Sequence, residues 1–421
     1  MRHVTSLLAL ALVGCGPAPS AGNQQVNLIA VLPMTGSYAA NGETHRAAIQ
    51  MAIDAIDRAG GIPGHTIRVS VVDPGDSPTD AEARVEAEVA KWTLPSGAVD
   101  VAAILSSTAA AQAAATRVAL RARVPHLEVS SGSGIDEIAL DATMDPSLEL
   151  APRPTCHHEA MLTAQFIGGK PYARLAVLRG PEAHDQMHTD TIRAELATGF
   201  PTVVVSPDLV MPTEGPYDDF IRQAMAQAPD AIFFHLRGDT YNVSFLRALK
   251  RLGFTRDIVT CGMARKTSLL SVVDPGLVDY LGGRTYFAMR GPVWGENLTR
   301  FKDAYRAFSG LSADTFSPSA YDSALLVALA AATAPDGDGA TIRDAILSTS
   351  SGGTPVQFDD VGTALSLLAQ GADVDYTGAS GTMDFRDDHT VAGQFYIERV
   401  DFDAATQVGA FTVLSSPTLV E

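Results

Sequence analysis

The sequence predicts an α/β fold built from two parallel-sheet units that follow one another along the chain. Strand-like and helix-like segments alternate from Val26 to Ser130 in the order βαβαβαβ, which is typical of a parallel sheet covered by helices on both faces. The alternation pauses at 151–154 and then resumes. With 421 residues, 46% of them hydrophobic, the chain has enough material for two separate cores.

In the first unit, each predicted strand is an apolar or alternating run, and each predicted helix has apolar residues at helical spacing. The run GGIPG at 60–64 ends the first helix, and Pro78-Thr79-Asp80 is a helix-start signal. The predicted strands are VNLIAVLP, HTIRVSVVD, VDVAAIL and VPHLEVS, and the predicted helices span 43–59, 79–92 and 109–122.

The second unit repeats this pattern, and a third section follows it. Its predicted strands are RLAVLRG, PTVVVSP, DAIFFHL and DIVTCG, and its helices span 156–167, 190–198, 216–227 and 243–253. The third section adds helices at 298–308, 319–334 and 341–349. The second of these is almost continuous in Ala and Leu, so we expect it to be buried. The run GTMDFRDDHTVAGQFYIERVDF predicts a hairpin that turns at Asp387-Asp388.

The charge of the chain excludes one class of partner. Lys and Arg number 30 against 48 Asp and Glu, a net charge of −18 at pH 7. A protein this acidic repels nucleic acid, and no basic run in the sequence reverses that. We therefore expect no nucleic-acid partner.

The first residues predict an export signal with a lipid anchor. Arg2 and His3 precede an apolar run at 4–13, and small residues lead to Cys15. This segment resembles the lipobox of bacterial lipoproteins, in which the cysteine becomes the acylated N-terminus. The alternative is an ordinary cleaved signal with an incidental cysteine. We predict a signal peptide at 1–14 and a lipidated tether at 15–25, which holds the protein on a membrane through its acyl chains.

The two remaining cysteines, Cys156 and Cys261, have no Cys-x-x-Cys spacing, so by themselves they do not predict a zinc site. An exported compartment permits a disulfide between them, and the sequence leaves that pairing open.

Four strings in the right order carry a family resemblance. They are VLPMTGSYAANGETHRAAIQMAIDAIDRAGGIPG, VVDPGDSPTDA, AYDSALLVALA and YTGASGTMDFRDDHTVAG. The chain resembles a type I periplasmic binding protein of the leucine/isoleucine/valine-binding branch, whose members are extracytoplasmic substrate-binding components of ABC transporters.

The resemblance implies two doubly wound, Rossmann-like lobes joined by a three-crossover hinge, with ligand held between them. By this resemblance, lobe one comprises 26–148 plus 290–376, and lobe two comprises 149–289 plus 377–421.

Two hydroxyl-rich loops are the first candidate ligand contacts. Each follows a predicted strand and precedes a predicted helix, so each lies at the carboxyl edge of a sheet, where doubly wound proteins bind ligands. Small residues expose backbone N–H groups to an anion, and hydroxyls add donors. In the family these loops hold the α-carboxylate of the ligand and contribute to its α-amine; the alternative is that they only cap helices. The candidate residues are Ser106, Ser107, Thr108, Ser131, Gly132 and Ser133.

Alignment with the family adds further positions that face the ligand. They are Tyr38, Asn41, His184, Asp185, Arg237, Asp239, Gly262 and Met263. The amino-acid binders place an acidic residue near the position of Gly262, whereas this chain has CGMA there. A buried ammonium without a partner is costly, so this departure counts against leucine-like ligands. Asp239 is one replacement for the missing acid. Alternatively, Arg237 binds a second ligand carboxylate, or forms a salt bridge between the lobes, or is solvated.

Metal and enzymatic sites are the rival interpretations. Cys156, His157, His158 and Glu159 are adjacent, so their side chains diverge around a helix. His184 and His188 are four residues apart, but the predicted helix starts only at 190. We therefore predict no metal. The sequence also lacks a Gly-x-Ser-x-Gly elbow, a Gly-x-Gly-x-x-Gly fingerprint and a phosphate-binding loop, so we predict no cofactor and no enzymatic activity.

The sequence thus predicts a solute-binding lipoprotein that captures a small, carboxylate-bearing ligand, an amino acid or a related compound, and delivers it to an ABC permease. One alternative is a lipoprotein of the same fold that senses its ligand for a signalling partner. A remote alternative is an exported hydrolase that uses His184 and Asp185.

Overall fold

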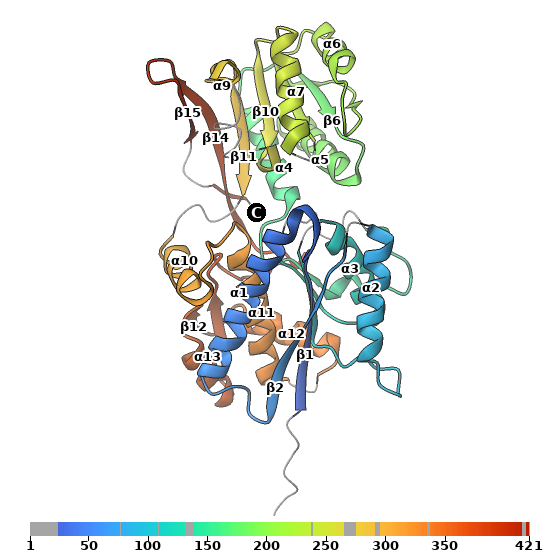
Figure 1. Cartoon of the computed structure of the whole chain (residues 1–421), viewed down its shortest axis with the longest axis vertical. Helices are drawn as coiled ribbons and strands as arrows, with labels where there is room; N and C mark the ends of the chain where they lie inside the picture. The colour runs from blue at the N-terminus through green and yellow to red at the C-terminus, as the bar shows by residue number, and fades with distance from the viewer. Residues whose placement is uncertain are drawn as a thin grey trace, which may run out of the picture.

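The computed structural model describes residues 24–75, 77–107, 109–130, 138–236, 239–264, 275–290, 295–334, 337–414 and 418–420. Two α/β lobes lie one above the other, each built on its own sheet, and the chain passes between them three times (Figure 1). The predicted fold class is confirmed. Among the described residues, no helix has the length and hydropathy needed to cross a bilayer.

Lobe one contains a five-stranded parallel sheet in the order β2-β1-β3-β4-β5. Its strands are β1 (Gln24–Val31), β2 (His65–Val72), β3 (Ala103–Ser106), β4 (His126–Glu128) and β5 (Glu149–Leu150). The helices between them are η1 (Gly36–Tyr38), α1 (Ala39–Arg58), α2 (Pro78–Lys91), α3 (Ala109–Ala122) and η3 (Pro146–Leu148). Later segments complete the lobe: α10 (Glu296–Ser309), α11 (Ser317–Thr333), α12 (Gly339–Thr349), β12 (Thr354–Gln357), α13 (Val361–Ala369) and β13 (Val374–Thr377).

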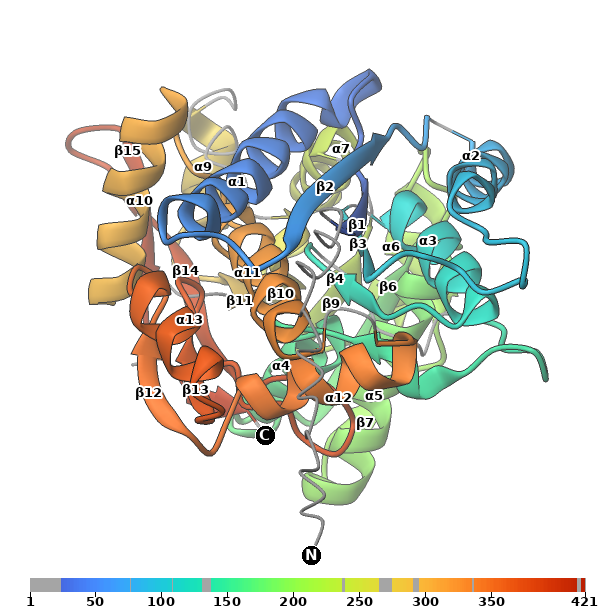
Figure 2. The same cartoon turned by 90° about the horizontal axis from the view of Figure 1, so that it is seen from below.

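The alternation of side chains along β1 builds a core on each face of this sheet. Leu28 and Ala30 pack in the core that contains α1 and α11, whereas Ile29 and Val31 pack in the core under α2 and α3. Because successive strand residues point to opposite faces, one continuous apolar run supplies both cores. Figure 2 shows α1 and α11 on one side of the sheet and α2 and α3 on the other. The predicted burial of α11 is confirmed, since every residue from Ser317 to Ala331 is buried.

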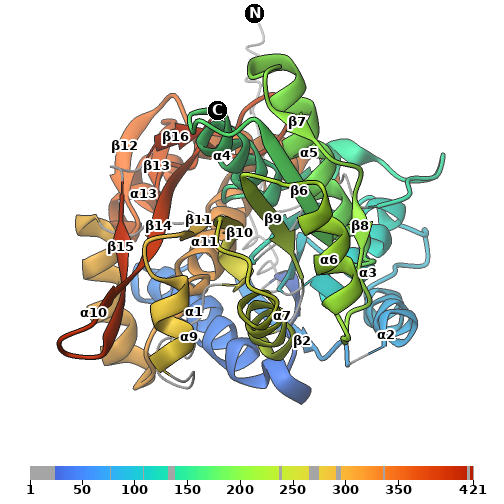
Figure 3. The same cartoon turned by 90° about the horizontal axis from the view of Figure 1, so that it is seen from above.

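Lobe two contains a nine-stranded mixed sheet, with the path β15-β14-β11-β10-β9-β6-β7 and with β8 and β16 at its margins. Its strands are β6 (Arg174–Arg179), β7 (Val204–Val205), β8 (Leu209–Val210), β9 (Ala231–His235), β10 (Asp257–Cys261), β11 (Thr285–Arg290), β14 (Gly393–Asp403), β15 (Val408–Val413) and β16 (Thr418–Val420). Its helices are α4 (Cys156–Gly168), α5 (Ala183–Gly199), α6 (Asp218–Ala226), α7 (Asp239–Arg251), η4 (Gly262–Ala264) and α9 (Pro275–Leu281). Helices α4 and α5 cover one face, and α6, α7 and α9 cover the other (Figure 3).

The two sheets present their carboxyl edges to each other. In Figure 1 the strands of lobe one run towards lobe two, and β11 runs in the opposite direction, towards lobe one. Since β6, β9 and β10 are parallel to β11, all four end at the edge that faces lobe one. Ligands of doubly wound sheets bind at this kind of edge.

Two predicted elements differ most from the structure. The helix expected from Asp190 begins seven residues earlier, at Ala183, because Glu182 and Asp185 form a capping box. The turn at Asp387-Asp388 is closed by one antiparallel bridge. The long hairpin is β14–β15, which turns at 404–407, where the string AATQ lacks the usual turn residues.

Asp314 fastens α1 to the start of α11. Its carboxylate accepts hydrogen bonds from Asn41 and Thr44 of α1, each 2.9 Å long, and pairs with His45 Nε2 at 3.1 Å. It also accepts from the Ser317 N–H at 2.8 Å. Burial alone would raise the pKa of Asp314, but hydrogen bonds from His45, Asn41 and Ser317 hold that pKa well below its usual range.

Replacing Asp314 by Ala should therefore lower the free energy of unfolding by about 3 kcal/mol at neutral pH, since the lost bonds are to a charged acceptor. Because the folded pKa lies below the unfolded value of about 3.9, this stabilisation is present above about pH 4 and is lost as the pH falls further. Urea unfolding between about pH 3 and 7 measures both effects. Asp54→Ala, on the exposed face of α1, is the control. An equal change in the free energy of unfolding in both variants contradicts the account.

Candidate functional site

The hydroxyl of Ser106 is engaged inside lobe one. Its Oγ lies 2.8 Å from His126 Nε2, and His126 Nδ1 lies 2.7 Å from Glu149 Oε2. If His126 donates from Nδ1 to the carboxylate, Nε2 accepts from Ser106. This connectivity is that of a hydrolytic triad, but Ser106 is buried within β3 and its hydroxyl is already engaged by His126. The chain Ser106–His126–Glu149 instead fastens β3, β4 and β5 together.

Ser107 is the next residue along, and its hydroxyl has no protein partner among the described residues. Its backbone N–H donates to Val31 O at 3.1 Å, which holds it at the end of β1. The side chain is fully buried, and α3 begins two residues later, at Ala109. A buried hydroxyl without a partner is costly, which makes Ser107 a donor available to a ligand.

The other predicted contacts in lobe one fall into two groups. Tyr38 is 56% exposed at the end of η1, and Asn41 is bonded to Asp314. The second group, which lies outside the described residues, comprises Thr108, Ser131, Gly132 and Ser133. Two predicted residues elsewhere, Arg237 and Cys15, also lie outside the described residues. Asp239 is the first residue of α7.

Glu159 brings a carboxylate to the place where the sequence lacks one. Its Oε1 accepts a hydrogen bond from the Gly262 N–H at 2.7 Å, and its side chain is 1% exposed. The string CGMA has no acid of its own, so the carboxylate near Gly262 comes from another part of the chain. The acid comes from α4, about a hundred residues earlier, so no local string could reveal it. In the sequence, Glu159 stands out only as part of the Cys-His-His-Glu run, a pattern that suggests metal binding and not a contact with Gly262.

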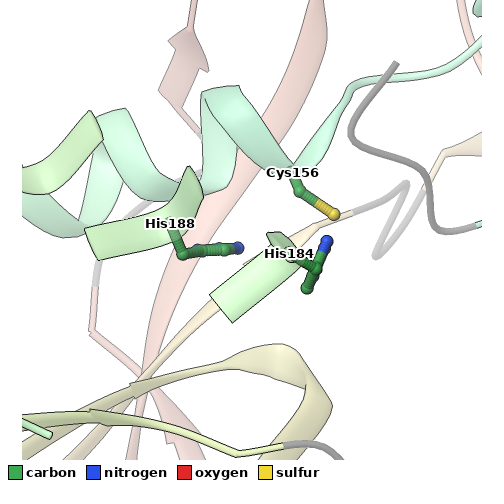
Figure 4. Close-up of side chains that lie close together, drawn as sticks. All are labelled: Cys156, His184 and His188. Carbon is green, nitrogen blue, oxygen red and sulfur yellow. The ribbon is translucent and has the colours of Figure 1, made fainter. Parts of the chain in front are cut away.

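His184 and Asp185 lie in the first turn of α5, and both are buried. Asp185 Oδ1 lies 2.6 Å from His235 Nδ1 at the end of β9, and Oδ2 accepts from the Glu182 N–H at 3.2 Å. A Cβ at Gly180 would lie 2.3 Å from Asp185 Oδ2, so only glycine leaves room for this carboxylate. Figure 4 shows His184 beside Cys156 and His188. Among the described residues, no disulfide joins Cys156 to Cys261.

The hinge contains a buried ion pair and a neutral histidine. Arg153 Nη2 donates to Glu128 Oε2 at 2.8 Å, and the two side chains are 3% and 0% exposed. His158 Nε2 accepts from Arg386, so its Nδ1 donates to Thr155 Oγ1. Burial, followed by the nearby Arg386 charge, lowers the pKa of His158 to about 4. These contacts tie the first crossover to β4 and to the third crossover.

Cavities also occur away from the facing edges. One of about 650 Å³ lies at the opposite end of lobe one and is lined by Leu94, Arg123, Asp145 and Asp338 among others. Another, of about 350 Å³, lies between the crossovers beside Arg153 and Gly393.

Comparisons with known proteins agree with this architecture. Comparison with curated proteins finds no match. Among solved structures, a leucine binding protein from Thermotoga maritima superimposes with a TM-score of 0.65 at 16% identity, covering 94% of this chain and 98% of that one. A branched-chain amino acid transporter substrate binding protein from Streptococcus pneumoniae, in complex with isoleucine, has a TM-score of 0.63 at 18% identity, covering 94% and 100%.

A third structure extends the range of ligands among similar proteins. An ABC transporter solute binding protein from Rhodopseudomonas palustris, in complex with 3,4-dihydroxy benzoic acid, has a TM-score of 0.64 at 16% identity, covering 94% of this chain and 97% of that one. At these identities the likeness establishes the fold. The family model described as "Periplasmic binding protein" matches residues 25–406. The chain therefore belongs to the periplasmic binding protein family.

Proposed function

We propose that this protein captures a small carboxylate-bearing solute, an amino acid or a related compound, between its two lobes and delivers it to an ABC permease. The observation that carries the proposal is the opposition of the two carboxyl edges (Figure 1). In this arrangement a ligand first binds one lobe, and the second lobe closes over it about the hinge. Binding and closure need no chemistry on the ligand.

On the side of lobe one, Ser107 and the first turn of α3 receive the carboxylate. The hydroxyl of Ser107 is a donor without a protein partner among the described residues. The first N–H groups of a helix lack intrahelical partners and carry partial positive charge. Together they favour a negatively charged group at this position.

On the side of lobe two, Glu159 receives the ammonium group of an amino acid. Its carboxylate is fixed by the Gly262 N–H, at the position where the resemblance calls for an acid. A buried ammonium needs such a partner, so Glu159 favours an amino acid over a simple carboxylate.

Export and anchoring complete the proposal. The family implies an extracytoplasmic location, and the leader that ends at Cys15 supports attachment through acyl chains. In Figure 1, β1 begins at the end of lobe one that is remote from lobe two. A tether attached there leaves the facing edges free for solute and for a permease.

A thermal-shift screen tests the proposal. Three compounds separate the ligand classes. Leucine represents the amino acids, 4-methylpentanoate is the same carboxylate without the amine, and benzoate represents the aromatic carboxylates. At a hundredfold excess over Kd, a ligand adds about 2.7 kcal/mol, which raises the Tm of a chain of this length by about 3 °C. We expect amino acids to raise Tm and 4-methylpentanoate to have little effect. A rise in Tm with benzoate alone contradicts the role of Glu159. The same screen includes other amino acids, dicarboxylates, amides and short peptides, and the absence of any rise in Tm across all of them contradicts the proposed function.

Replacing Ser107 by Ala should weaken binding of the best solute about tenfold, since one hydrogen bond to a charged group is lost. The unliganded Tm should not fall, because the hydroxyl has no protein partner among the described residues. Isothermal titration calorimetry measures the affinity. Ser323→Ala is the matched control, because the hydroxyl of this buried serine donates to Ser319 O within α11. Unchanged affinity in Ser107→Ala excludes this residue from the site.

A further inference from the structure

We propose that lobe two contains a transition-metal site, of the kind that Zn²⁺ occupies, formed by Cys156, His184, His188, His235 and Cys261. The proposal is independent of the solute, and it revises the sequence-based expectation of no metal. That expectation weighed Cys156 only with its neighbours in the chain, and His184 only with His188, because nothing in the sequence places these two groups together.

Two overlapping triads of donor atoms define the site. Cys156, His184 and His188 form one, and His188, His235 and Cys261 form the other. Within each triad, one donor atom from every residue lies within 4.8 Å of the others. All five side chains are at most 3% exposed. Figure 4 shows the first triad, with the Cys156 sulfur beside a ring nitrogen of His184 and the His188 ring turned towards both.

The fold explains why these residues meet. His184 and His188 are four residues apart in α5, so they share one face of the helix. His235 and Cys261 are the last residues of the parallel neighbours β9 and β10, and the carboxyl ends of such strands lie at the same edge. Cys156 begins α4, which packs against α5. The cluster therefore occupies the edge of lobe two that faces lobe one.

The contact between Asp185 and His235 is typical of a metal site. Asp185 Oδ1 lies 2.6 Å from His235 Nδ1, so the carboxylate holds the tautomer whose Nδ1 carries the proton. The lone pair then lies on Nε2. A carboxylate that orients a ligating histidine in this way recurs in zinc proteins. The capping contact with Glu182 and the absence of a side chain at Gly180 fix the carboxylate in turn.

The donor set favours Zn²⁺ in tetrahedral geometry. Imidazole and thiolate are its usual ligands, at about 2.0–2.1 Å for nitrogen and about 2.3 Å for sulfur, which puts neighbouring donors about 3.3–3.8 Å apart. Since the donor atoms of each triad lie within 4.8 Å of one another, the triads need to contract by at most about 1.5 Å to reach this spacing. A neutral imidazole has one lone pair, so His188, which both triads share, serves one ion. We infer a single ion bound by His188 and three of the other four residues.

Metal analysis of the full chain carrying Cys15→Ser tests the site, because Cys156 and Cys261 are then its only thiols. After removal of metal with a chelator, added Zn²⁺ should be retained at one ion per chain through gel filtration, as measured by plasma mass spectrometry. Co²⁺ in its place should give thiolate-to-metal absorption and the intense visible bands of a tetrahedral ion.

Three variants make the test specific. His188→Asn should abolish retention of Zn²⁺, and Asp185→Asn should weaken affinity about 10–100-fold, since its role is to orient His235. His157→Asn is the matched control. It follows Cys156 directly, but its Nδ1 faces Thr191 and it belongs to neither triad, so it should retain one ion.

The outcomes are distinct. If His188→Asn fails to fold, the rate at which the two thiols of the parent chain are alkylated serves as a second readout. Bound Zn²⁺ should slow this alkylation. Stoichiometric Zn²⁺ that is lost in His188→Asn and kept in His157→Asn supports the site. No retained Zn²⁺, retention that is the same in both variants, or a disulfide between Cys156 and Cys261 in the purified protein overturns it.

Discussion

Replacing Asp322 by Ala is expected to lower the free energy of unfolding by about 4 kcal/mol, one of the two largest effects that we predict. Asp322 lies in the second turn of α11 and is 0% exposed. Its carboxylate accepts from Tyr376 Oη at 2.6 Å, from the Ala379 N–H at 2.8 Å, and from the N–H and hydroxyl of Ser380. Burial raises the pKa of Asp322, and hydrogen bonds from Ser380 and Tyr376 oppose that rise.

The loss is large because the carboxylate and its donors lie in different parts of the chain. Tyr376 belongs to β13, and Ala379 and Ser380 follow it where the chain leaves lobe one. Truncation leaves several buried donors unsatisfied, at about 1–3 kcal/mol each. A Cβ at Gly378 would lie 2.5 Å from Asp322 Oδ2, so glycine is required for this approach.

Urea unfolding followed by circular dichroism measures the effect. Ser323→Ala, which alters the next residue of the same buried helix, should change stability by less than about 1 kcal/mol. Equal midpoints for Asp322→Ala and Ser323→Ala contradict the assignment.

Replacing Arg153 by Met should lower the free energy of unfolding by about 3–5 kcal/mol, because it leaves the buried Glu128 carboxylate without its cation. The pair joins the end of β4 to the first crossover, and Arg153 Nη1 also donates to Pro154 O at 2.9 Å. Thermal or urea unfolding measures the loss.

The double variant Glu128→Leu/Arg153→Met separates the charge from the packing. Apolar residues that replace both members of a buried pair are often neutral, so the double variant should recover most of the stability. A double variant that is less stable than Arg153→Met shows that the pair is not the source of the effect.

Much of the fold was predictable because the physical signals are local. The burial of β1 on both faces, the helical spacing in α1 and the Ala-rich run of α11 each follow from a short segment. The predicted start of α5 was wrong for two reasons. Buried histidines take positions in its first turns that usually hold apolar residues, and the capping box formed by Glu182 and Asp185 is not an obvious sequence signal. The β14–β15 turn was missed because its sequence lacks Gly, Pro and Asn.

The candidate site was less predictable because its contacts span long separations. Glu159 reaches Gly262 from α4, and the cluster around His188 draws on four elements. Residues that bond within their own lobe, such as Ser106 and Asn41, cannot be distinguished from ligand contacts by residue type alone. The positions at which the predicted strands end indicate the correct edge of each sheet, but they do not show which side chains meet there.

The central claim is that a solute binds between the two carboxyl edges. A crystal structure of the protein with the best solute from the thermal-shift screen tests it most directly. We expect the carboxylate of the solute within hydrogen-bond distance of Ser107 and the first turn of α3, with lobe two closed over it. A solute bound in the cavity beside Arg123 and Asp145, or at the crossovers beside Gly393, would contradict the account.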